Sequence, residues 1–105
     1  MNRTVYKIQF AKRLPVGMVD YHLMTAALAA ESLYGRNAVR LDAVARLNSK
    51  NRTVIIDAET QVGVDLAKMF MGFMTNEYGE KSFAVTKAEE FMRFDDQELL
   101  ARVIL

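Results

Sequence analysis

The chain has no cysteine, one proline and one histidine among its 105 residues. The absence of cysteine excludes disulfide bonds, zinc–thiolate sites and a thiolate nucleophile. A single histidine excludes a histidine-rich metal site, and we expect neither a metal nor a cofactor. The N-terminal segment has no apolar signal core, and no apolar run is long enough to cross a bilayer. We therefore expect no membrane insertion and a cytoplasmic location.

The charges are nearly balanced overall but unevenly distributed. The formal net charge is +1, yet residues 1–58 contain nine Lys/Arg and four Asp/Glu, whereas residues 59–105 contain five and nine. Such an asymmetry can steer a charged partner, but it is far below the basic density of nucleic-acid-binding domains, and we expect no nucleic acid as partner. The length and the 51% of hydrophobic residues fit a single domain, residues 1–105, with a modest core.

Hydrophobic periodicity predicts the elements of the first half of the chain. Apolar and polar residues alternate over residues 5–10, which indicates a half-buried strand, and a loop with the only proline follows. Apolar residues at helical spacing predict a helix over residues 20–34. Alternation over residues 38–47 and β-branched residues over 52–57, separated by a polar turn, predict a hairpin.

The second half is predicted to contain a helix over residues 59–77, a strand over residues 82–87 and a closing helix that begins near Asp95. Residues 88–94 can join either of the last two elements. The order strand, helix, strand, strand, helix, strand, helix predicts an α+β fold, an open-faced sandwich with helices on one face of the sheet. Without the last helix, the same order describes a ferredoxin-like domain, which is the alternative. Strand order distinguishes the two.

His22 is the candidate reaction centre because it is the only histidine and lies near the predicted helix start. The N-terminus of a helix presents unpaired amide groups and a positive dipole, which bind anions and favour a neutral imidazole. Such an imidazole can act as a nucleophile that accepts a phosphoryl group. The alternative is a histidine packed at the edge of the core face.

The segment around this histidine resembles HPr, the histidine-containing phosphocarrier of the sugar phosphotransferase system. Residues 21–27 read Tyr-His-Leu-Met-Thr-Ala-Ala, where the family has Leu-His-x-Arg-Pro-Ala-Ala. Met24 and Thr25 stand where the family has arginine and proline. The resemblance implies an HPr-like open-faced sandwich whose histidine is phosphorylated by enzyme I and passes the group to a transporter subunit. It implies phosphotransferase components as protein partners and at most a phosphocarrier, since such a protein is no self-sufficient catalyst.

Two further features bear on this resemblance. Without the family's arginine, phosphotransfer through His22 needs another cation, and Lys12 and Arg13 are the nearest in sequence. Residues 56–63 match in outline the family segment that contains a regulatory serine, which places Thr60 at the serine position. A rival register over residues 67–74 puts a methionine there instead. The alternative interpretation of the threonine is a helix-start residue.

A second apolar row on the first predicted helix suggests a docking surface formed by Tyr21, Met24 and Leu28. The alternative is a helix packed on two sides. The methionines of residues 69–74 can extend such a surface, although methionine at helical spacing is more often part of the core. The leading hypothesis is an HPr-like protein that acts through docking, and the alternative is a non-catalytic interaction domain or a homo-oligomer.

Overall fold

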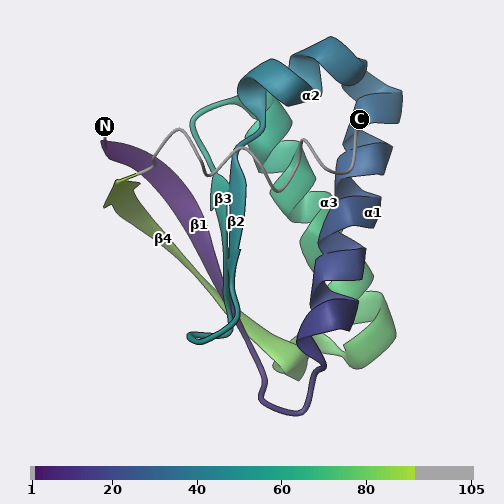
Figure 1. The fold of residues 1–105 in the computed structure, drawn as a ribbon, viewed down its shortest axis with the longest axis vertical. Helices are drawn as coiled ribbons and strands as arrows, with labels where there is room; N and C mark the ends of the chain where they lie inside the picture. The colour runs from purple at the N-terminus through teal and green to yellow at the C-terminus, as the bar shows by residue number, and fades with distance from the viewer. Residues whose placement is uncertain (1, 92–105) are drawn as a thin grey trace.

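The computed structural model describes residues 2–91, which form a four-stranded sheet with three helices on one of its faces (Figure 1). In chain order the elements are β1 (Asn2–Phe10), α1 (Val16–Tyr34), α2 (Arg36–Asp42), β2 (Ala45–Asn48), β3 (Thr53–Asp57), α3 (Gln61–Tyr78), the 3-10 turn η1 (Glu80–Ser82) and β4 (Phe83–Phe91). The predicted α+β class and the open sheet with helices on one face are confirmed. The closing helix predicted from Asp95 lies outside the described residues.

The sheet has the strand order β2-β3-β1-β4, and every neighbouring pair is antiparallel. Helix α1 and the short helix α2 therefore connect two strands, β1 and β2, that are separated by β3. Helix α3 connects β3 and β4, which are separated by β1. Two such interrupted β-α-β units make up the split β-α-β arrangement of ferredoxin-like domains. The strand order is thus that of the predicted alternative.

The core lies between the sheet and the helices because apolar and polar residues alternate along the strands, so that one face of the sheet is apolar. On β1, Ile8 and Phe10 are buried in the main cluster, as are Val54 and Ile56 on β3. The register pairs Ile8 with Val54, so the apolar faces of the two strands coincide. From α1 the core receives one large residue, Leu23, and several small ones. The complete buried set of that helix is Val19, Leu23, Ala26, Ala27 and Ala30.

Helix α1 begins at Val16, four residues before the predicted start. Pro15 is its N-cap residue with a φ of −65°. Proline is compatible with a helix start because its fixed φ matches the helix and its missing N–H would be unpaired there. The predicted loop with the proline is therefore present, but it ends at Pro15 instead of continuing to the predicted helix start.

The strand predicted over residues 38–47 is also wrong, because its first half is helix α2. Val39 and Ala43 are buried and lie four residues apart, as on one face of a helix, whereas Leu41 between them is 76% exposed. The helical spacing was hidden within an alternating pattern. Of the predicted segment, only the part that falls in β2 (Ala45–Asn48) belongs to the sheet. The last described strand, in turn, extends beyond the prediction to Phe91.

Helix α3 lies close to β3 where Gly63 faces the end of the strand. A Cβ atom at this glycine would lie 2.1 Å from the carbonyl oxygen of Asp57. Asp57 is fully buried and accepts two hydrogen bonds of 2.9 Å from the guanidinium of Arg3. This bidentate pair joins β1 to the end of β3, and the carboxylate raises the pKa of Arg3 through the hydrogen bond.

Candidate functional site

His22 is the seventh residue of α1, in its second turn. The unpaired amide groups of a helix belong to its first four residues, and in α1 these start at Val16. The expectation that the histidine lies at the helix N-terminus is therefore wrong.

The imidazole of His22 is half-buried between two tyrosines. Its Nε2 lies 3.2 Å from the hydroxyl oxygen of Tyr78, at the end of α3. Both tyrosine rings approach it edge-on, with centroid distances of 5.5 Å for Tyr21 and 5.4 Å for Tyr78. In one tautomer the phenol donates to a neutral Nε2, and in the other Nε2–H donates to the phenol. The hydrogen bond joins the two long helices.

Of the two cations considered for phosphotransfer, one bonds the tyrosine that also bonds His22. The Arg13 guanidinium donates to the backbone carbonyl of Tyr78 over 3.3 Å, and the hydroxyl of the same tyrosine bonds His22. Lys12 instead lines a hollow beside the sheet. The two bonds lie at opposite ends of Tyr78, with the guanidinium at its backbone carbonyl and the imidazole at its phenol hydroxyl. Nucleophilic attack by Nε2 would require the Tyr78 hydroxyl to move away from it.

Thr60 is the N-cap residue of α3, and its hydroxyl is used in two hydrogen bonds. The Oγ1 atom accepts from the backbone N–H of Gly63 over 3.0 Å and donates to the carbonyl of Asp42 over 3.0 Å. Phosphorylation would remove the donated bond and place a charged group against the carbonyl of α2. The geometry is that of a helix-start residue.

The opposite end of the helix pair contains a hydrogen bond between the hydroxyl of Tyr34 and the carboxylate of Asp65. Asp65 also accepts from the side-chain amide of Gln61 over 2.9 Å. The tyrosine hydrogen bond, followed by that of the glutamine, lowers the pKa of Asp65. The same carboxylate raises the pKa of Tyr34. This contact joins the C-terminus of α1 to the first turns of α3.

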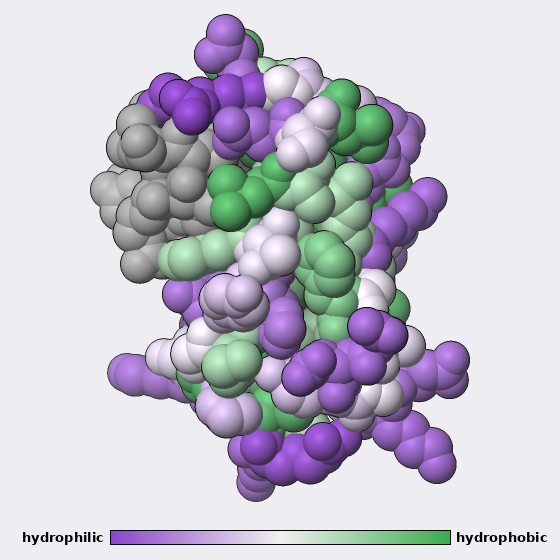
Figure 2. Space-filling model, turned by 90° about the vertical axis from the view of Figure 1, so that its right-hand side faces the viewer, coloured by the Kyte–Doolittle hydropathy of each residue, from purple (hydrophilic) through white to green (hydrophobic). Residues whose placement is uncertain are grey.

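The predicted docking surface is partly exposed. Tyr21 is 59% exposed and Leu28 is 49% exposed, whereas Met24 is partly buried at the flank of the row. The structure adds Met18, which is 43% exposed and three residues before Tyr21. Figure 2 looks onto the helical side of the molecule and shows hydrophobic side chains along its middle, with hydrophilic ones at the top, bottom and right-hand rim.

The methionines of α3 do not extend this surface. Met74 is fully buried, and Met69 and Met71 pack partly buried against the main core. The core interpretation of these residues is confirmed.

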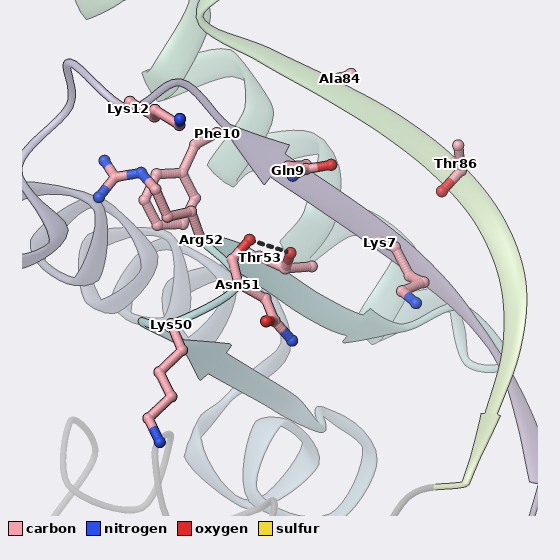
Figure 3. A pocket seen from close by; sticks show the side chains of 10 residues that line it. All are labelled: Lys7, Gln9, Phe10, Lys12, Lys50, Asn51, Arg52, Thr53, Ala84 and Thr86. Atoms are coloured by element: carbon pink, nitrogen blue, oxygen red, sulfur yellow. Dashed lines mark hydrogen bonds between the residues drawn. The ribbon is translucent and has the colours of Figure 1, made fainter.

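Sequence reasoning missed a basic hollow of about 640 Å³ beside the β2–β3 turn (Figure 3). Among the described residues, four cations and no Asp or Glu line it. The excess of basic residues over residues 1–58 was the available signal, but the sequence did not show that they meet. The cations are Lys7, Lys12, Lys50 and Arg52.

Within residues 2–91 no three His, Asp or Glu side chains gather in a way that would bind a metal ion. Over the same residues, no helix has the length and apolar character needed to cross a membrane. Comparison of the chain with family models, with curated proteins and with solved structures finds no match.

Proposed function

We propose that this chain is a non-catalytic interaction domain that binds a protein partner through the outer face of α1. The observation that supports this is the row formed by Met18, Tyr21 and Leu28, which are 43%, 59% and 49% exposed. Single exposed apolar residues are ordinary, but a row of large ones on one helix face is typical of a contact surface. Tyrosine and methionine are also enriched in protein interfaces.

The fold itself does not require this row to be apolar. Helix α1 already buries its other face with Val19, Leu23 and three alanines, whose small size lets the helix lie close to the sheet. The row points away from that face, since successive helix residues are about 100° apart. Charged residues in the row are therefore compatible with folding.

The test replaces Tyr21 and Leu28 together with glutamate and uses Leu33→Glu as the matched control. Leu33 is 62% exposed on the same helix but lies about 140° around its axis from Leu28. We expect the double variant to lose a partner that the wild type and the control both retain in affinity capture. Sedimentation equilibrium of the three proteins shows whether that partner is a second copy. Equal capture by all three proteins, or unfolding of the double variant, contradicts the proposal.

Phosphotransfer through His22 is the second candidate. The observation that favours it is that Arg13 and His22 both bond Tyr78, one at its backbone carbonyl and the other at its hydroxyl, because a guanidinium brought to the imidazole would stabilise a phosphoryl group. Incubation with phosphoenolpyruvate and enzyme I, followed by detection of acid-labile phosphate, tests it against a His22→Ala control. Absence of label on the wild type would exclude this role.

A further inference from the structure

We propose that residues 92–105 dock on the face of the sheet opposite the helices, where they cover the outer cluster formed by Val5, Val44 and Ile55. These three buried residues are separate from the main core. The contact is independent of the docking function of α1, which lies on the other side of the sheet. The burial of the outer cluster, the place where β4 ends and the sequence after it support this assignment.

The strand register places the outer cluster on the face away from the helices. Successive side chains of a strand point to opposite faces, and Val5 and Ile55 alternate with the residues of β1 and β3 that belong to the main core. Val5 is paired with Asp57, and the backbone N–H of Asp57 donates to the carbonyl of Val44 over 2.8 Å. The cluster therefore extends across the sheet from β1 over β3 to the start of β2.

The outer cluster is buried although it lies on the side without helices. The exposed fractions are 0% for Val5, 4% for Ile55 and 9% for Val44, and the carboxylate residue among them, Asp57, is also fully buried. Within residues 2–91 all three helices lie on the opposite face of the sheet (Figure 1). Burial to this extent requires a second layer over the strands.

The burial is confined to the half of this face that lies next to the end of β4. There Ala88 is paired with Val5 and is partly buried. Toward the other end of the same face, Gln9 and its partner Ala84 are both exposed. Strand β4 ends at Phe91, three residues beyond Ala88. The chain that follows β4 therefore starts beside the buried half of the face.

The sequence that follows β4 has the length and the pattern for this contact. A helix from Asp95 to residue 105 would be about 16 Å long at about 1.5 Å per residue. The distance from β4 to β2 is about 14 Å at about 4.8 Å per neighbouring strand, so such a helix spans the sheet. Its apolar residues recur at i, i+1, i+4 and i+5, which forms a single stripe along one side. The stripe consists of Leu99, Leu100, Val103 and Ile104.

The first experiment measures the contact in the full chain. Since the chain has no cysteine, Ala101→Cys introduces a single attachment site for a nitroxide label, on the side of the predicted helix away from the stripe. Paramagnetic relaxation should broaden the methyl signals of the outer cluster and leave those of Leu28, on the outer face of α1, sharp. Sharp methyl signals of the outer cluster in this protein overturn the proposal.

A mixture identifies the chain that supplies the segment. Isotope-labelled wild-type protein is combined with an equal amount of nitroxide-labelled protein that has no isotope label. The outer-cluster methyl signals of the wild type should remain sharp, because each sheet is covered by its own chain. Broadening in the mixture would show that a second copy supplies the segment and overturns the proposal.

The second experiment replaces Leu100 and Val103 together with glutamate. Ala101→Glu combined with Leu105→Glu is the matched control, because it adds the same charge at positions turned more than about 120° from the middle of the stripe. A soluble paramagnetic agent should relax the outer-cluster methyl groups severalfold faster in the stripe variant than in the wild type or the control. Methyl groups of the main core should stay protected in all three proteins.

Unchanged protection of the outer cluster in the stripe variant, or equal exposure in both variants, overturns the proposal. The nitroxide experiment leaves the stripe intact, so it decides the question also where the stripe variant fails to fold.

Discussion

Two glycines on α3 provide a direct test of how closely this helix approaches the sheet. A Cβ at Gly63 would lie 2.1 Å from the backbone oxygen of Asp57 and 3.2 Å from Oγ1 of Thr60, whereas a Cβ at Gly72 would have no atom within 4 Å. A carbon and an oxygen atom in contact are normally more than 3 Å apart. Gly63→Ala therefore requires the start of α3 to move about 1 Å away from β3.

The magnitudes follow from the two environments. At residue 63, overpacking costs about 1–3 kcal/mol, and displacement of the helix start weakens the Thr60 cap, which contributes about 1 kcal/mol. The expected loss in unfolding free energy is about 2–4 kcal/mol. At the exposed residue 72, alanine gains about 0.5–1 kcal/mol because glycine is the poorer helix former. The same substitution on one helix thus has opposite signs at two positions.

Urea denaturation followed by circular dichroism at 222 nm measures both variants. With a slope of about 1–2 kcal/mol per molar urea, the midpoints should move by more than 1 M downward for Gly63→Ala and by several tenths of a molar unit upward for Gly72→Ala. A Gly63→Ala variant within about 0.5 kcal/mol of the wild type would refute the close approach of α3 to β3. Equal destabilisation by both variants would show that alanine is unfavourable in α3 for another reason.

Three more outcomes are expected. Arg3→Met leaves the buried carboxylate of Asp57 without its bidentate partner and should destabilise the domain by about 3 kcal/mol in urea denaturation; a loss under 1 kcal/mol would contradict the pairing. Thr60→Ala should cost about 1 kcal/mol, measured in the same way, while Thr60→Ser should retain most of the cap. The hydrogen bond between Tyr34 and Asp65 lowers the pKa of Asp65 and raises the pKa of Tyr34. It therefore contributes fully to the unfolding free energy at neutral pH. It is lost as the pH falls below about 4 or rises above about 10. Unfolding free energy measured against pH should therefore be flatter at both extremes for Tyr34→Phe than for the wild type, and parallel profiles would exclude the bond.

The hydrophobic periodicity of the sequence predicted an element correctly where only one face of that element is buried. The alternation around Ile8 predicted β1, and the helical spacing of Leu23, Ala26 and Ala30 predicted α1. It failed where two periods coincide, because Val39 and Ala43 fit both an alternating strand and a helix. The choice between strand and helix depended on which residues the fold buries. Leu41, which an alternating strand would bury together with Val39 and Ala43, is exposed.

The candidate sites were less predictable than the fold. His22 was singled out by being the only histidine, but its position in the second turn of α1 depended on where the helix begins. Its partner Tyr78 is 56 residues away and meets it only because α1 and α3 pack together. For Thr60 the helix-start interpretation agrees with the observed cap, since the sequence places it at the beginning of an amphipathic segment.

The sequence by itself determined the strands β1 and β3, the long helices α1 and α3 with most of their core residues, and the absence of cysteine chemistry. These properties depend on residue types and on neighbours within one or two turns. The tertiary structure alone decided the strand order β2-β3-β1-β4, the pairing of Arg3 with Asp57 across 54 residues, and the meeting of lysines from three segments in one hollow. Such contacts form between segments whose patterns are equally compatible with several pairings, so only the packed fold selects one.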